Sequence, residues 1–404
     1  MRKNSSTYCP LPFIHSHAGV NRKFRPCCNA YQISDKHDWT YSLDNQTHEE
    51  WFTDEMMVQL RKDLLTGKRN DLCKVCWEQE DVGAQSYRQQ YIKKYENVDV
   101  ETPSIQYLDL KLSNECNLAC RMCDYGSSHQ IYKDMIALEQ KSLHIPAYWD
   151  RIPYFEKTAD KNMIVAYPEN VVDEIKSLIP QLKYLKVTGG EPTITKKFNE
   201  IVDTAIDMNC IQDIELNLTT NGTRLTPDYL EKLSKFKKVK IKVSIDGIGS
   251  TYDYIRHPFK WKNIQDRIKD IFHVVDGRKF YLDFNLCATV YNAENIPVFY
   301  NWIQDNTTAD APLYIQSNLG PDDHALDFKW LSADVLHKSI KDLPLTTETE
   351  TYIKRAESYM NVDKPKEQLV EIKNITTSLD QVRGQNYKDY LEPLTVKWLD
   401  SIDV

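Results

Sequence analysis

The stretch IQYLDLKLSNECNLACRMC, residues 105 to 123, decides the fold, because a strand-like run passes straight into closely spaced cysteines. Residues 105–112 carry the pattern of a β-strand. Cys116, Cys120 and Cys123 follow with the spacing CxxxCxxC, and no fourth cysteine lies nearby in the sequence. Three thiolates on one loop can hold three corners of an iron-sulfur cube and leave one iron open. An open coordination position is typical of a catalytic metal site.

The composition of the chain favours a globular protein over a membrane-spanning, secreted or nucleic-acid-binding one. The chain has 404 residues, of which 41% are hydrophobic and 27% charged, the balance of a soluble globular protein with one large domain or two. A formal net charge of −8 argues against a nucleic-acid partner. The first residues lack the apolar stretch of a secretory signal, and no run of about 18 apolar residues could span a membrane. We therefore expect a cytoplasmic protein, in which ten cysteines favour metal binding over disulfides.

After residue 104, β-rich runs alternate with helical patterns. Parallel pairing follows, because each return between strands is long enough for a crossover helix. We predict an α/β fold with a partial (β/α)6 TIM-like barrel, whose ligands sit at the carboxyl ends of the strands. The predicted strands are residues 105–112, 182–189, 214–220, 239–246, 279–290 and 312–318.

Helical patterns occupy most of the remaining chain. The periodicity predicts helices over residues 49–65 and 77–95, before the barrel. The long connection over residues 124–181 holds the aromatic stretch HIPAYWDRIPYF, which could cover the mouth of the barrel. From residue 321 onward the pattern is helical and charged, and it contains no motif.

The second predicted strand ends in VTGGEP, residues 187 to 192. Its two glycines let backbone polar groups approach a ligand closely, and Glu191 could order the cysteine loop or a ligand ammonium group.

The alternative for the three cysteines is a zinc site completed by a distant histidine, or simple burial. The CxxxCxxC spacing directly after a strand favours the iron-sulfur interpretation.

Together these motifs resemble those of radical S-adenosylmethionine (SAM) enzymes. The resemblance covers roughly residues 104 to 320. It implies that Cys116, Cys120 and Cys123 bind a 4Fe-4S cluster whose open iron is chelated by SAM. It also implies that Gly189, Gly190, Glu191 and Pro192 contact the methionine end of SAM, and that a flavodoxin or ferredoxin supplies electrons.

Further strand-end segments resemble those of the same family. TTNGT (219 to 223) and VSIDG (243 to 247) are similar to the segments beside the ribose, YDYIRHPF to one whose arginine pairs with the SAM carboxylate, and TVYNAENI (289 to 296) to the adenine-side strand. The implied cofactor contacts are Asn221, Ser244, Asp246, Arg256 and Val290.

A second group of cysteines precedes the barrel, in YCPLPFIHSHAG, RPCCNA and DLCKVCWEQE. The group resembles the auxiliary-cluster module called SPASM, or twitch in its one-cluster form, although here it comes before the barrel. The resemblance implies a second 4Fe-4S cluster held by Cys9, Cys27, Cys73 and Cys76. Cys27 is preferred to Cys28 because the PC dipeptide matches the motif. The alternative is a zinc site, which His15 and His17 could join.

The expected organisation is a twitch-like module over residues 1–103, a radical SAM barrel over 104–320 and a helical region over 321–404. We expect an oxidoreductase that cleaves SAM to a 5′-deoxyadenosyl radical and removes hydrogen from a peptide or protein side chain. The alternatives are dehydrogenation of a small alcohol, sugar or nucleotide, and a degenerate barrel with structural metal sites. Cys287 is a candidate hydrogen-atom donor, although core packing is the commoner role of such a cysteine, and Cys210 is expected to be buried.

Overall fold

The computed structural model describes residues 5–30, 41–149, 160, 162–274, 279–306, 313–316 and 324–403, with backbone only for 313–316. The chain divides into two compact units. The first unit comprises Met1–Ser113, Val165–Asn217 and Lys235–Lys237, and the second comprises Asn114–Ile164, Leu218–Ser234 and Lys238–Val404. Residues 150–155 of the aromatic stretch HIPAYWDRIPYF lie outside the described residues, as do residues 156–159 and 161 of the same connection.

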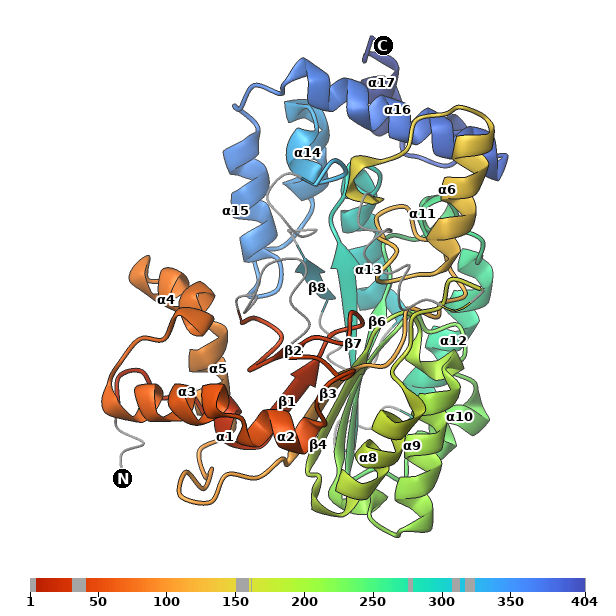
Figure 1. Ribbon diagram of the computed structural model, residues 1–404. Coiled ribbons are helices and arrows are strands. Elements are labelled where there is room, and N and C mark those ends of the chain that lie inside the picture. Colours follow the sequence, from red (N-terminus) through yellow and green to blue (C-terminus); the bar gives the residue numbers. More distant parts are fainter. Residues whose placement is uncertain are drawn as a thin grey trace. The chain divides into compact units, whose positions relative to one another are not determined.

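The first unit combines strands with helices from two separate stretches of the chain (Figure 1). Its helices and strands are α1 (Leu11–Ile14), β1 (His15–Ala18), β2 (Phe24–Arg25), α2 (His48–Thr53), α3 (Glu55–Thr66), α4 (Lys74–Asp81), α5 (Tyr87–Lys94), β3 (Tyr107–Lys111), α8 (Glu169–Leu178), β4 (Tyr184–Thr188) and α9 (Lys196–Asp207). The strand β5 (Glu215–Thr220) crosses the boundary between the two units.

The strands of the first unit pair in the order β2-β1-β3-β4. The β1 and β2 pair is antiparallel, whereas β1 with β3 and β3 with β4 are parallel. Burial along β4 alternates with a period of two, so Leu185 and Val187 face the core. Helices α8 and α9 lie side by side next to β4 and bury their apolar residues (Figure 1).

Each helix predicted before the barrel consists of two helices, because a capping residue inside the predicted range begins a new helix. Asp54 ends α2 and caps α3, where its side chain accepts a hydrogen bond from the Met56 N–H. Ser86 forms a capping box with Gln89 at the start of α5, which separates α5 from α4. The predictions of single helices over residues 49–65 and 77–95 were therefore wrong in their continuity.

The second unit holds the other parallel strands and the carboxyl-terminal helices. Its helices and strands are α6 (Gln130–Gln140), α10 (Pro227–Leu233), β6 (Lys238–Ser244), α11 (Gly249–Ile255), α12 (Trp261–Val274), β7 (Phe280–Cys287), α13 (Ile296–Asn306), β8 (Leu313–Gln316), α14 (Ala333–Lys341), α15 (Glu350–Tyr359), α16 (Lys366–Arg383) and α17 (Pro393–Asp400). Parallel β6, β7 and β8 are neighbours in that order. Figure 1 shows α16 next to α6.

The predicted α/β fold is confirmed, as is the helical carboxyl-terminal region. All six predicted strands are present as β3 to β8, and crossover helices separate them as a partial barrel requires. The prediction missed β1, which adds residues 15–18 to the sheet beside β3. Among the helices of the described residues, none is long and apolar enough to cross a membrane.

Candidate functional site

The three motif cysteines lie together in one loop of the second unit. Cys116 and Cys120 are buried with Leu118 between them, and Met122 and Cys123 pack against this group. The Cys123 N–H donates to the Cys120 carbonyl at 3.0 Å, so the end of the motif is a tight turn. The loop therefore presents its thiols from a compact and largely dry segment.

Asn221, a residue assigned to SAM binding from the sequence, contacts this loop directly. Its Nδ2 lies 3.8 Å from Cys116 Sγ and donates to Asn117 Oδ1 at 2.8 Å. Its own Oδ1 accepts hydrogen bonds from the N–H and hydroxyl of Thr223, at 3.0 and 2.8 Å. The turn after β5 thus supports the loop beside its first cysteine.

Backbone contacts from α11 and the residues after it fix the middle of the loop. The Ala119 N–H donates to the His257 carbonyl at 2.8 Å, and the Arg121 N–H donates to the Ile255 carbonyl at 3.0 Å. On the other side, Trp149 Nε1 donates to the Cys123 carbonyl at 3.1 Å. The hydrogen bonds from both sides satisfy the backbone groups of a buried segment that belongs to no helix or strand.

The thiols of the loop influence one another. A hydrogen bond from Cys123 lowers the pKa of Cys120, and nearby Arg256 acts in the same direction. The same hydrogen bond raises the pKa of Cys123, because that thiol is the donor. The three closely spaced thiols of the loop suit the ligand set of an iron-sulfur cluster.

The ends of β6 and β7 carry a buried ion pair. Arg256 Nη2 and Nε each lie 2.6 Å from Asp246 Oδ2, and Asp246 Oδ1 accepts the Cys287 N–H at 2.9 Å. Burial raises the pKa of Asp246, and the Arg256 charge opposes that rise. Asn292 donates to the carbonyls of Asp246 and Cys287, at 3.2 and 2.8 Å. The predicted cofactor contacts at these strand ends therefore form one network.

The remaining predicted residues of the second unit lie close to this network. Ser244 is the last residue of β6 and pairs with Asn285 of β7. Val290 is fully buried, and its N–H donates to the Leu326 carbonyl at 3.0 Å. Burial raises the pKa of the Cys287 thiol, which keeps it protonated. In the first unit, Cys210 is partly exposed, so the prediction that it is buried was wrong.

The GGEP residues belong to the first unit, directly after β4. Gly189 has φ +133°, and a Cβ placed there would lie 2.8 Å from the Ser113 carbonyl oxygen. The Gly190 N–H donates to that same oxygen at 2.9 Å. Glu191 is fully buried, and its Oε1 accepts the Thr193 N–H at 3.0 Å and the Thr193 hydroxyl at 2.6 Å. Glycine is therefore required by close backbone approach at this turn.

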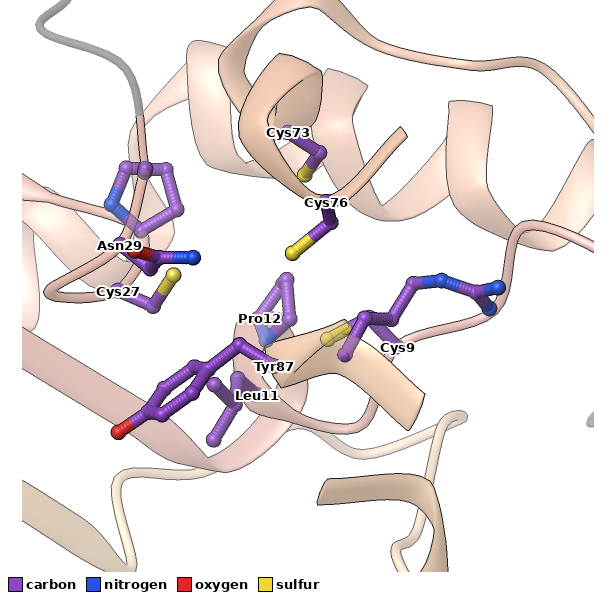
Figure 2. Close-up of a pocket in the computed structure, with 11 residues that line it drawn as sticks. Cys9, Leu11, Pro12, Cys27, Asn29, Cys73, Cys76 and Tyr87 are labelled. Carbon is purple, nitrogen blue, oxygen red and sulfur yellow. The ribbon is translucent and has the colours of Figure 1, made fainter. Parts of the chain in front are cut away.

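Four of the five amino-terminal cysteines line one cavity in the first unit. Figure 2 shows the sulfur atoms of Cys9, Cys27, Cys73 and Cys76 around this space, into which Cys76 points directly. Burial raises the pKa of Cys73 to about 12, and the neighbouring Cys76 adds to the rise. Burial likewise raises the pKa of Cys9, with further contributions from Cys73 and Cys76.

The donor set of this cavity fits an iron-sulfur cluster. Four thiolates are the usual ligands of a cubane, and thiols that raise one another's pKa need a cationic group to ionise together. Across the described residues, no three His, Cys, Asp or Glu side chains converge closely enough to hold a single metal ion. Cys9, Cys27, Cys73 and Cys76 are the residues that would hold the cluster.

Cys28 points to a different environment. Its Sγ lies 3.5 Å from the Tyr87 hydroxyl and 3.6 Å from Lys186 Nζ. Lys186 in turn forms an ion pair with Asp109, with 2.8 Å between Nζ and Oδ2. The structure therefore places Cys27 at the cavity and Cys28 beside a buried ion pair.

The histidines of HSH lie on strand β1. His17 Nδ1 lies 3.0 Å from the Asp109 carbonyl oxygen, and His15 Nδ1 lies 3.1 Å from the Pro26 carbonyl oxygen. The register places His17 opposite Asp109, and Asp109 opposite Lys186. His17, Asp109 and Lys186 therefore lie in register across three neighbouring strands, and we call them the polar row.

The polar row was not predicted from the sequence, and neither were the residues of the carboxyl-terminal region that hold the cysteine loop. The polar row had a sequence signal, because Asp109 and Lys186 interrupt runs of apolar residues in two predicted strands. Arg121 stands inside the cysteine motif, and its guanidinium donates to Asp380 Oδ1 at 2.5 Å. No pattern in the sequence links Arg121 to a residue so far along the chain.

Comparison with known families supports the assignment of the cysteine loop. Residues 110–281 match the Radical SAM superfamily. The matched segment begins in β3, contains the three cysteines, the GGEP turn and the Asp246–Arg256 pair, and ends in β7. The family match therefore covers all the predicted SAM contacts except Val290.

Curated relatives match over short segments. Mycofactocin maturase MftC of Mycolicibacterium smegmatis is 33% identical over 82 residues, which are 20% of this chain and 19% of that protein. Sporulation killing factor maturation protein SkfB of Bacillus subtilis is 29% identical over 147 residues, which are 36% of this chain and 28% of that protein. The chain thus spans less than a third of the length of these two relatives.

Solved structures of similar proteins cover more of the chain at lower identity. Streptococcus suis SuiB bound to S-adenosylmethionine is 15% identical, with coverage of 77% of this chain and 60% of that one, at a TM-score of 0.35. The structure of anSMEcpe with bound AdoMet is 17% identical, with coverage of 58% and 57%, at a TM-score of 0.34.

Proposed function

We propose that this chain is a radical SAM enzyme that removes hydrogen from a peptide or protein side chain. The observation that carries the proposal is the buried loop with Cys116, Cys120 and Cys123, which lies inside the segment that matches the superfamily. The names of the relatives MftC and SkfB describe maturation proteins, which supports a peptide or protein substrate.

The residues of the loop would hold a 4Fe-4S cluster with one open iron. When bound, the cluster would supply the one-electron reduction that breaks the C5′–S bond of SAM into methionine and a 5′-deoxyadenosyl radical, and that radical would take a hydrogen atom from an unactivated carbon of the substrate. Asn221 and the backbone contacts of Ala119 and Arg121 keep the loop in shape. Gly189 of the GGEP turn permits the close approach of the Ser113 backbone that fixes this turn. The Arg256 guanidinium would face the SAM carboxylate.

The amino-terminal cavity would hold a second 4Fe-4S cluster. This part of the proposal is supported by the four thiols of Cys9, Cys27, Cys73 and Cys76, which line that cavity (Figure 2).

SAM cleavage tests the proposal. Protein reconstituted anaerobically with iron and sulfide should release 5′-deoxyadenosine when it is given SAM and dithionite. The C120A variant should release none, whereas C210A should behave as the unaltered protein, because Cys210 lies at a partly exposed position outside every cysteine cluster. Absence of 5′-deoxyadenosine from reconstituted, cluster-loaded protein would contradict the proposal.

Metal analysis tests the second cluster separately. About eight iron and eight sulfide per chain are expected from two cubanes. The variant C73A/C76A should lose about half of each and still cleave SAM. A content of four iron and one zinc per chain would instead show that the amino-terminal cysteines hold a structural zinc ion, and would contradict the second cluster.

A further inference from the structure

Arg121, which stands between two of the motif cysteines, is a fully buried cation. Its Nε donates to the Tyr254 carbonyl at 3.1 Å, and its guanidinium carbon lies 3.5 Å from the centre of the Tyr254 ring. Its Nη2 donates to Asp380 Oδ1 at 2.5 Å and to Gln385 Oε1 at 2.9 Å. A charged side chain of the cysteine loop is therefore held by the carboxyl-terminal region.

The end of α16 is built to receive this cation. Gly384 adopts a left-handed conformation that ends the helix, and the Gln385 N–H then donates to the Asp380 carbonyl at 2.9 Å. The second carboxylate oxygen of Asp380 accepts the Tyr387 N–H at 2.7 Å. The carboxyl end of a helix carries partial negative charge, which adds to the attraction of Asp380 for a guanidinium.

The backbone of Arg121 is fixed as firmly as its side chain. Its N–H donates to the Ile255 carbonyl at 3.0 Å, and its carbonyl accepts the Tyr148 hydroxyl at 2.7 Å. Because Cys120 is the preceding residue and Cys123 follows two positions later, the placement of Arg121 constrains the direction of both thiols. A substitution of Asp380 would therefore change the positions of the Cys120 and Cys123 thiols.

We propose that Asp380 is a positioning residue for the three-cysteine loop, and that through Arg121 the end of α16 sets the ligand geometry of the SAM-binding cluster. This inference rests on the proposed function. It assigns a role to the helical region in which the sequence showed no motif. Asp380 reaches the cysteine loop through its hydrogen bond and ion pair with Arg121.

The chain offers a matched control on the same helix. Arg383 of α16 pairs with Asp134 of α6 at 2.6 Å, and the Arg383 side chain is as well buried as that of Arg121. D134A therefore removes one arginine-aspartate pair of α16 that joins this helix to α6 and not to the cysteine loop. D380A removes the pair that reaches the loop. A third variant, R121M/D380L, replaces the buried pair by apolar side chains, which can restore stability.

The test uses the full chain, reconstituted anaerobically and reduced with dithionite. Electron paramagnetic resonance (EPR) spectra are recorded with and without SAM, and thermal unfolding is followed in parallel. In D380A we expect the fraction of cluster signal that responds to SAM to fall about tenfold, as for loss of an outer partner of a metal ligand. D134A should keep the full response. D380N keeps an oxygen acceptor for Arg121 and should retain part of the response to SAM. This variant provides the test if D380A fails to fold.

The double variant separates positioning from stability. We expect R121M/D380L to regain thermal stability and still lack the full response to SAM. If R121M/D380L recovers both, or if D380A responds as fully as D134A, the pair only stabilises the fold and the inference is overturned. If the unaltered protein shows no SAM-dependent signal, the proposed function fails, and the inference fails with it.

Discussion

Lys186 of β4 and Asp109 of β3 form an ion pair in the interior of the first unit, with 2.8 Å between Nζ and Oδ2. The Asp109 side chain is 2% exposed and that of Lys186 18%. Burial alone would lower the pKa of Lys186, but the attraction of Asp109, together with Cys28 and Tyr91, outweighs burial, and the pKa is raised. Lys186 and Asp109 are therefore both charged at neutral pH, at a place where charge is costly unless it is paired.

Removal of the Lys186 charge should destabilise the protein. K186M leaves Asp109 buried without its cation, and we expect the free energy of unfolding to fall by about 3–5 kcal/mol. K186M/D109L should recover most of this loss. K68M is the control, because the Lys68 side chain is 66% exposed beside Asp63 and should contribute less than about 1 kcal/mol. Urea unfolding of the three variants measures the difference, and equal losses in K186M and K68M would contradict the assignment.

Arg256 should matter for SAM affinity beyond its effect on stability. R256K keeps the positive charge and loses the planar fork that holds Asp246 at 2.6 Å through two nitrogens. Loss of one charge-assisted hydrogen bond, about 1.5–3 kcal/mol, corresponds to a rise in the Kd for SAM of about 10- to 100-fold. Calorimetric titration of reconstituted protein with SAM measures it. A lower melting temperature with an unchanged Kd would leave Arg256 only a structural role.

The GGEP turn should tolerate no side chain at Gly189. G189A combines a φ of +133° with a Cβ 2.8 Å from the Ser113 carbonyl oxygen. Gly67 provides the comparison, because its φ is +86° and a Cβ there meets nothing within 4 Å. G67A should cost about 1 kcal/mol of stability from the left-handed backbone alone, and G189A more than that. The two free energies of unfolding test the close approach, which would be refuted if they were equal.

His48 should make the protein less stable in weak acid. Burial lowers the pKa of His48 to about 3, and its Nδ1 lies 2.8 Å from the Ser16 hydroxyl. Because the unfolded histidine has a pKa of about 6.5, the unfolded state binds more protons between these two values. The stability contribution is fully present above about pH 6.5 and is lost as the pH falls toward 3.

The size of this effect follows from the two pKa values. Between neutral pH and pH 5, His48 should account for a loss of about 2 kcal/mol. H48Q lacks the titrating group, so its free energy of unfolding should fall less over the same range. Urea unfolding of both proteins at the two pH values gives the comparison. An identical fall in the two proteins would show that His48 is not the responsible group.

Local patterns in the sequence predicted the strands and the cysteine loop, because both depend on neighbouring residues. The alternation in YLKVT gives β4, and CxxxCxxC places three thiols on one loop whatever surrounds it. The break between α2 and α3 was also visible in principle, since Asp54 is a good capping residue inside the predicted helix.

Contacts between distant residues could not be predicted in this way. Asp380 is one of many acidic residues on charged helices, and only the folded chain shows that it meets Arg121. Similarly, the strand character of HSH depends on pairing with β3, which lies about 90 residues further along the chain. Propensity and spacing describe a segment, whereas these contacts depend on which segments the fold brings together.

The central claim is that three thiolates hold a cluster whose fourth iron is open to SAM. Mössbauer spectroscopy of protein reconstituted with ⁵⁷Fe, recorded before and after SAM is added, tests it most directly. We expect one iron of the cluster bound by Cys116, Cys120 and Cys123 to change its isomer shift when SAM is present, and the remaining irons to stay as they were. A spectrum that SAM leaves unchanged, with every iron already fully coordinated by the protein, would contradict the claim.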